Sequence, residues 1–181
     1  GFFGTDATTT SWYMPQPGTD LRYVNAIADA HIALAQPAQN FGASTTLQLA
    51  SGASDSDVLV KFDVSGETQP ILFAKLSFRV TTSGGAPRAQ VRYVSDDSWT
   101  QAGVVWNNAP SGAEPPVVIT GQVSRDGTIS ADVTSAITAD SDGVVSFRLS
   151  VPNAAGAYIS SEGGQPPRLI LVVAQAGPPI P

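Results

Sequence analysis

The chain contains no cysteine among its 181 residues. It can therefore form no disulfide bond, and it offers neither a thiol nucleophile nor a thiolate ligand for a metal. Histidine is almost as scarce, since His31 is the only one. A Ser-His-Asp arrangement has no support here, because the chain lacks a Gly-x-Ser-x-Gly elbow. A zinc site is disfavoured by the same scarcity of ligands, and we predict that the protein is not an enzyme.

Charged residues are also few, at 13% of the chain, which is about half the usual share. Acidic residues outnumber basic ones by fifteen to nine, which gives a net charge of −6 and an isoelectric point near 4.4. Nucleic-acid binding needs a basic face that neutralises phosphates, so we expect no nucleic-acid partner. No apolar run approaches the ~20 residues that a membrane-spanning helix requires, and we expect no membrane span.

Turn-forming residues are plentiful, with 17 glycines and 14 prolines. Between the turns, apolar and polar residues alternate: Val58, Val60 and Phe62 share one face of an extended segment, and Lys61 and Asp63 share the other. The same alternation recurs in residues 74–80, 89–94, 144–151 and 167–173. Several short alternating segments separated by turns predict an all-β fold, an antiparallel two-sheet sandwich.

Three pairs of aspartates have the residue types that cleave glycosidic bonds in some enzymes. Each pair is flanked by serine or glycine, as expected of Asx-turns and solvated loop tips. We therefore interpret all of them as turn residues: Asp55 and Asp57, Asp96 and Asp97, and Asp140 and Asp142.

A more specific pattern lies between Ser98 and Pro110, where the sequence reads SWTQAGVVWNNAP. Other characteristic segments stand before and after it in a fixed order: ADAHI (28–32), LVKFDVS (59–65), DVTSAI (132–137) and PPRLIL (166–171). Together they resemble the DNRLRE-type domain, which is related to disaggregatase repeats and to some carbohydrate-binding modules. The resemblance extends from about Ala28 to Val173. It implies a jelly-roll sandwich in which ADAHI and DVTSAI form strands.

The resemblance also implies a non-catalytic module that lies outside the cell or on its surface. Some similar domains are described as sugar-binding, and others belong to large surface proteins without a known ligand. Within the pattern, Trp99 and Trp106 offer flat faces for a sugar ring, and the amides of Asn107 and Asn108 could bond sugar hydroxyls. The competing interpretation is that the indoles are packed and the amides hold the backbone of a turn.

Related jelly rolls often hold a structural calcium ion, and hard cations take oxygen ligands from several loops. Asp29, Asp63 and Asp132 lie in strands that match the resemblance. The sequence does not assign the ligands of such an ion, and we expect no other cofactor.

The first 20 residues differ from the rest of the chain and are divided from it by PQPGTD (15–20). This N-terminal arm concentrates apolar side chains in a stretch too short to fold alone: Phe2, Phe3, Trp12, Tyr13 and Met14. Such residues need cover from solvent. The arm either folds back on its own sandwich, formed by residues 21–181, or adds a strand to the sheet of a neighbouring copy.

Two functions follow from these observations. The first is a non-catalytic extracellular structural subunit that assembles with itself into a filament through strand donation by its arm. The alternative is a carbohydrate-binding module of a secreted or cell-surface protein, with a polysaccharide as its partner.

Overall fold

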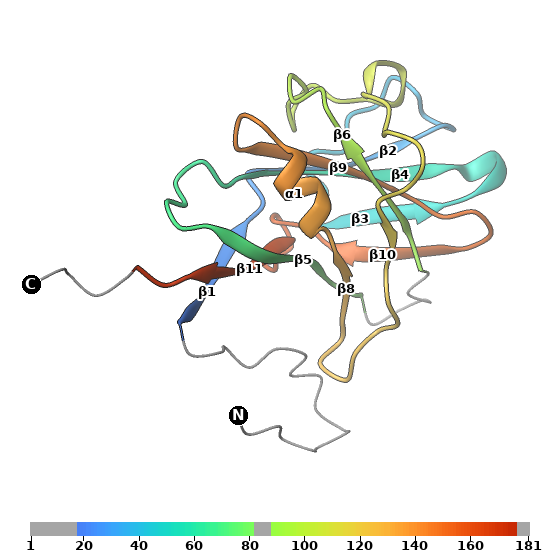
Figure 1. Ribbon diagram of the computed structural model, residues 1–181. Helices are drawn as coiled ribbons and strands as arrows, with labels where there is room; N and C mark the ends of the chain where they lie inside the picture. Colours follow the sequence, from blue (N-terminus) through green and yellow to red (C-terminus); the bar gives the residue numbers. More distant parts are fainter. Residues whose placement is uncertain (1–17, 82–87, 177–181) are drawn as a thin grey trace, which may run out of the picture.

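The alternating segments form the strands of two antiparallel sheets that lie face to face (Figure 1). The computed structural model describes residues 18–81 and 88–176. The smaller sheet has the order β1-β11-β5-β8, with bounds Thr19–Asn25, Arg168–Ala174, Ile71–Arg79 and Thr128–Asp132. The larger sheet has the order β10-β3-β4-β9-β6-β7, with bounds Ala155–Ile159, Thr46–Ala50, Ser56–Asp63, Val144–Ser150, Gln90–Val94 and Val118–Ile119, and β2 (Ala28–Ala33) also pairs with β4. The prediction of an all-β antiparallel sandwich is confirmed.

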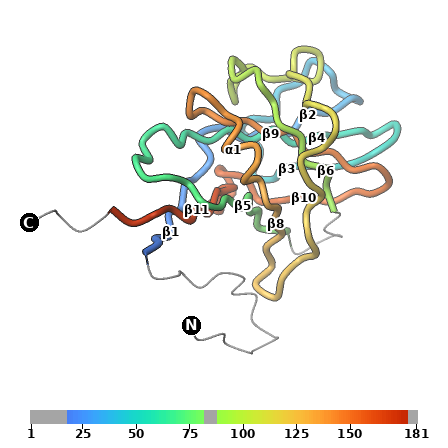
Figure 2. The backbone as a smooth tube through the Cα atoms, viewed as in Figure 1, coloured from blue at the N-terminus to red at the C-terminus, as the bar shows by residue number. Residues whose placement is uncertain are grey.

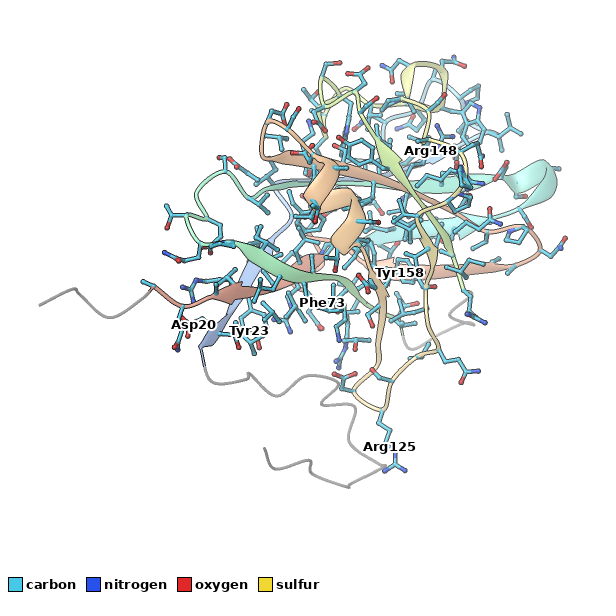
Figure 3. All side chains as sticks on the ribbon, viewed as in Figure 1. Asp20, Tyr23, Phe73, Arg125, Arg148 and Tyr158 are labelled. Carbon is cyan, nitrogen blue, oxygen red and sulfur yellow. The ribbon has the colours of Figure 1, made fainter. Side chains whose placement is uncertain are left out.

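The central core fills the space between the two sheets. Val58, Val60 and Phe62 of β4 point into it and are fully buried, as the alternation predicted. Tyr158 of β10, which is labelled in Figure 3, stacks on Phe78 of β5 with ring centroids 4.7 Å apart, so an aromatic pair joins the larger sheet to the smaller one. Burying side chains of this size supplies most of the driving force for folding.

A second apolar cluster lies on the opposite face of the larger sheet, and we call it the outer cluster. It consists of Ala28, Ala30, Ile32, Leu59, Val94, Trp99 and Val104. Trp99 and Val104 belong to the segment after β6, which therefore folds back over this face of the sheet. Lys61 points away from the central core, as predicted. It is nevertheless only 9% exposed, because the segment after β6 covers this face.

The predicted strand over Asp132–Ile137 is wrong beyond its first residue. Strand β8 ends at Asp132, and the short helix α1 occupies Thr134–Ala139. The Asp132 carboxylate explains the change, because its Oδ1 accepts hydrogen bonds from the backbone N–H (3.0 Å) and the hydroxyl (2.7 Å) of Thr134. This Asx-type turn ends the extended backbone, and Ile137 then packs against the central core.

The described chain begins at an edge of the sandwich. Strand β1 pairs only with β11 and lies beside it at the edge of the smaller sheet (Figure 2). It starts at Thr19, two positions before the boundary at Leu21 that the sequence suggested. The proposed assembly residues of the arm lie outside the described residues. Within the described ranges, no helix has the length and apolar character needed to cross a bilayer.

Candidate functional site

A groove of about 510 Å³ opens on the outer face of the larger sheet, at the end where β4 begins and β9 ends. Strands β6 and β9 supply its floor, and the loops before β4 and after β6 supply its walls. The groove is lined by Ser51, Gly52, Asp55, Asp57, Gln90, Arg92, Trp106, Ser111, Gly112, Glu114, Arg148, Ser150, Val151 and Pro152. Nine of these fourteen residues have polar or charged side chains, so the groove is suited to a hydrophilic ligand.

Arg148 of β9 lines the groove and is labelled in Figure 3. Its Nε donates to Asp57 Oδ2 at 2.7 Å, and its Nη1 donates to the carbonyl of Pro110 at 3.0 Å. The guanidinium also lies 5.5 Å from the ring centroid of Trp106, within the range of a cation–π contact. Strand β9 and the loop after β6 are thereby held together around the indole.

Arg92 of β6 is the cross-strand neighbour of Arg148. Two like charges in such a position repel unless acceptors surround them. Arg92 donates through Nε to Glu114 (2.8 Å), through Nη1 to Ser150 (2.9 Å) and through Nη2 to Gln90 (3.0 Å). These acceptors fix its guanidinium in the groove.

Asp57 is not in a turn, and that interpretation of it is wrong. It belongs to β4, where the extended backbone directs its carboxylate to the outer face, and it is only 6% exposed. Burial raises the pKa of Asp57, while the neighbouring Arg148 guanidinium lowers it and Asp55 raises it further. Its Oδ1 has no hydrogen-bond partner among the described atoms.

The groove therefore combines donors and acceptors beside an aromatic face. Each guanidinium carries more N–H donors than its protein contacts use, and the exposed carboxylate of Glu114 offers acceptor oxygens. A sugar hydroxyl both donates and accepts, so adjacent hydroxyl groups can bond an arginine and a carboxylate at once. The partly exposed Trp106 adds an apolar surface on which a sugar ring can stack.

Trp99 occupies a different environment from Trp106. It is 6% exposed within the outer cluster, and its Nε1 donates to Ser146 Oγ at 3.1 Å. Lys61 Nζ lies 4.6 Å from its ring centroid and donates to the carbonyls of Asp97 and Trp99. Only part of Trp99 lines a smaller hollow of about 250 Å³ next to the groove. The two tryptophans of the sequence pattern are therefore not brought into one binding surface.

The two asparagines that follow Trp106 also have different contacts. Asn108 Oδ1 accepts from the Val105 N–H at 2.8 Å, and its Nδ2 donates to the Gly103 carbonyl at 2.9 Å. These bonds close the short 3₁₀ turn η2 (Trp106–Asn108). The exposed Asn107 contributes its backbone N–H, which donates to the Pro37 carbonyl at 3.0 Å. The contribution of both amides to sugar binding stays a prediction.

The sequence reasoning missed Arg92, Arg148, Asp57 and Glu114 as site residues. A signal existed, because basic residues are rare in this chain and the alternation directs both arginines away from the core. What the alternation cannot show is that β6 and β9 are neighbours, which places the two guanidinium groups side by side.

The carboxylates considered for a metal ion lie in separate places. Asp63 Oδ1 accepts from the backbone N–H and the hydroxyl of Ser65, whereas Asp132 ends β8 and Asp29 lies in β2. Within the described part of the chain, Asp97, Asp140 and Asp142 bring one ligand atom each to within 4.8 Å of one another. Calcium binding is not tested by these positions alone and stays a prediction.

Comparison with known proteins agrees with this geometry. The family model described as carbohydrate-binding module family 96 matches residues 21–173. This range includes every residue of the groove and both sheets except Thr19, Asp20 and Ala174 at the ends of β1 and β11. It begins earlier in the chain than the resemblance seen in the sequence, which started at Ala28. No curated protein gives a significant match. Because the family model matches most of the chain, this protein belongs to carbohydrate-binding module family 96.

Proposed function

We propose that this protein is a non-catalytic carbohydrate-binding module that binds a polysaccharide in the groove beside Trp106. The observation that carries the proposal is the juxtaposition, on one sheet face, of a partly exposed indole, two guanidinium groups and the exposed carboxylate of Glu114. Membership of a carbohydrate-binding-module family supports it independently. Such families are typical of secreted and cell-surface proteins, and we infer the same location here.

Binding to a panel of neutral and uronate-containing polysaccharides, measured by affinity electrophoresis and calorimetry, tests the proposal. Replacing Trp106 by alanine removes the stacking surface and should weaken binding of the best ligand at least about tenfold, the equivalent of ~1.4 kcal/mol. Arg148→Ala should weaken it as well, because it removes donors and leaves Asp57 without its partner.

Tyr23→Ala is the matched control. Tyr23 is an aromatic residue, 58% exposed, on β1 of the opposite sheet, where Arg168 lies 4.8 Å from its ring centroid. Its loss should leave binding and melting temperature nearly unchanged. If Tyr23→Ala abolishes binding and Trp106→Ala does not, the site is on the other sheet. If no polysaccharide of the panel binds, the proposed function is wrong.

Self-assembly through the N-terminal arm is a separate proposal for the same chain. The feature that favours it is the position of β1, the first described strand, at an edge of the smaller sheet. Strand addition by another chain takes place at the edge of a sheet. Deletion of residues 1–17 should abolish filaments seen by negative-stain microscopy. Filaments of unchanged appearance after the deletion would exclude strand donation by the arm.

A further inference from the structure

Two adjoining hollows lie on the outer face of the smaller sheet, and together we call them the trough. Their volumes are about 310 Å³ and about 410 Å³, and both are lined by Ser77, Thr128 and Arg168. Leu76 and Phe78 of β5 point into the central core, so Ser77 between them faces outward. Among the described residues, none lines both the trough and the groove of the larger sheet.

The register of the strands gathers three cationic side chains around Ser77. Lys75 and Arg79 lie two positions before and after it on β5, and they share its face of the sheet. Arg168 of β11 is the cross-strand partner of Ser77. It is therefore a diagonal neighbour of both other cations, at about 7–8 Å, which long side chains can span. These are three of the nine basic residues in a chain of net charge −6.

Hydroxyl groups form the floor between these cations. On the far side of β5, Ser130 of β8 pairs with Ser77, and Thr128 pairs with Arg79. Ser77 is only 6% exposed, so it lies at the bottom of the trough. Both serines and Thr128 line the trough, and hydroxyls can donate hydrogen bonds. The trough thus offers charged and neutral donors on three adjacent strands.

The two arginines are held in position without a carboxylate partner. No ion pair between described residues includes Arg79 or Arg168. Arg79 donates to the backbone carbonyl of Asp126, and the Arg168 guanidinium lies 4.8 Å from the ring centroid of Tyr23. Each guanidinium carries more N–H donors than these contacts use. Like charges on neighbouring strands repel each other, so an anion between them is favoured.

Asp126 is the one carboxylate among the described residues that line the trough. Its Oδ1 accepts from the hydroxyl (2.7 Å) and the backbone N–H (3.1 Å) of Thr128, which closes the turn before β8. Three cations and one carboxylate leave the lining with two net positive charges. Burial lowers the pKa of Lys75 to about 8, while Asp126 raises it and Arg168 lowers it. A bound anion would favour the charged form of Lys75.

We propose that the trough is a second ligand site, which binds the sulfate or phosphate ester group of a ligand between Arg168, Arg79 and Lys75. Such a tetrahedral group has three terminal oxygens that accept hydrogen bonds, whereas a carboxylate has two. Arginine binds oxyanions of this kind through two parallel N–H donors. Three cations over a floor of hydroxyls match the tetrahedral group better than the planar one. The proposal does not depend on polysaccharide binding in the groove.

NMR titration of the full chain with three small probes tests the ligand class: glucose 6-sulfate, glucose 6-phosphate and glucuronate. At low salt, at least one of the esters should bind with a Kd of about 1 mM or below. Glucuronate should bind at least about tenfold more weakly, because its carboxylate reaches fewer of the donors. The tighter ester identifies the group that the site prefers. Saturable binding of neither ester, or equal binding of glucuronate, would overturn the proposal.

Two variants locate the ester, and a third is the matched control. Arg168→Gln and Arg79→Gln change exposed side chains, so the chain should fold, and each should weaken ester binding at least about tenfold. Arg125→Gln removes the same charge from the exposed tip of the loop before β8, outside the lining of the trough (Figure 3). It should weaken binding by less than about twofold, because solvent screens the charge. An equal loss in all three variants would show unspecific attraction and refute the site.

The groove variant separates the two sites. Trp106→Ala should leave ester binding unchanged, and Arg168→Gln should leave polysaccharide binding unchanged, because the residues belong to different sheet faces. Ester binding that disappears in Trp106→Ala and persists in Arg168→Gln would place the ester in the groove and refute the second site. A failure of polysaccharide binding alone would refute only the function proposed for the groove.

Discussion

At the scale of single residues, several polar side chains of β2 and β4 are buried here. Lys61, Asp57 and His31 are each at most 9% exposed. Lys61 and Asp57 lie on the outer face of the larger sheet, whereas His31 is paired with the core residue Val58, and each of the three side chains has a hydrogen-bond partner. A change in the protonation state of such a group changes the stability of the fold, because burial penalises the charged form.

His31 gives the clearest case. Its imidazole stacks on Phe41 with centroids 4.4 Å apart, and Nδ1 lies 3.2 Å from the Thr46 carbonyl. A carbonyl only accepts, so Nδ1 carries the proton in the neutral ring. Burial lowers the pKa of His31 from 6.5, and the bond to Thr46 opposes this in part. Just below pH 6.5, His31 is therefore protonated in the unfolded chain but still neutral in the folded chain.

We therefore expect the contribution of His31 to stability to be complete above pH 6.5 and to be lost as the pH falls through the lowered pKa. The loss is at most about 1.4 kcal/mol per pH unit. Because the chain has one histidine, a proton NMR titration reports this group directly. Urea unfolding at about pH 7.5 and about 5.5 gives the linked free energy, and His31→Gln should reduce the difference. An NMR midpoint at or above 6.5 would contradict this account.

At the scale of elements, strands with regular alternation are predictable from the sequence. Val58, Val60 and Phe62 lie in the core because a strand has a period of two, whatever its neighbours are. The helix after β8 was missed because its origin is a single side chain, Asp132, which turns the backbone at Thr134. The groove was missed for another reason. It depends on sheet order and on the loop that carries Trp106, and neither is a local property.

The turn before β9 provides a prediction about backbone geometry. Gly143 has a φ of +83°, and a Cβ there would lie 2.8 Å from Ser65 Cβ. Its carbonyl also accepts the Val64 N–H at 2.8 Å, so the turn cannot shift without breaking the link between β4 and β9. Gly143→Ala should therefore lower the free energy of unfolding by about 1–3 kcal/mol.

Gly66→Ala is the control in the adjoining loop. A Cβ at Gly66 meets no atom within 4 Å, and Gly66 is not among the glycines with positive φ. Its substitution should change stability by less than about 1 kcal/mol. Equal effects of the two substitutions in urea unfolding would show that the geometry at Gly143 is not a constraint.

The η2 turn provides a second prediction at this scale. Asn108 uses both ends of its amide to close the turn, so Asn108→Ala should cost about 1–2 kcal/mol and displace Trp106. Asn107→Ala should cost less than about 0.5 kcal/mol, because the bond to Pro37 uses only its backbone. Chemical denaturation of both variants, with polysaccharide binding as a second readout, checks the difference. A larger loss for Asn107 would show that its side chain has a role of its own.

At the scale of the whole molecule, both ends of the described chain are joined in one pair of strands. Residues Thr19–Asn25 pair along their full length with Arg168–Ala174, and the next strand, β5, covers the other side of β11. The central core includes Val173 at one end of this pair and Leu169 at the other. The family match has almost the same limits, 21–173. The described contacts of the core thus join strands near both limits of the family match.

A chain reduced to residues 18–176 should therefore fold as the full chain does. We expect its melting temperature to lie within about 2 °C of that of the full chain, because no described core residue is removed. Calorimetry measures this, and polysaccharide binding should be retained because every residue of the groove is present. A fall of about 10 °C or more would mean that the removed ends pack on the sandwich, as expected if the arm folds back on its own molecule. An unchanged melting temperature together with a loss of filaments would instead show that the arm acts between molecules.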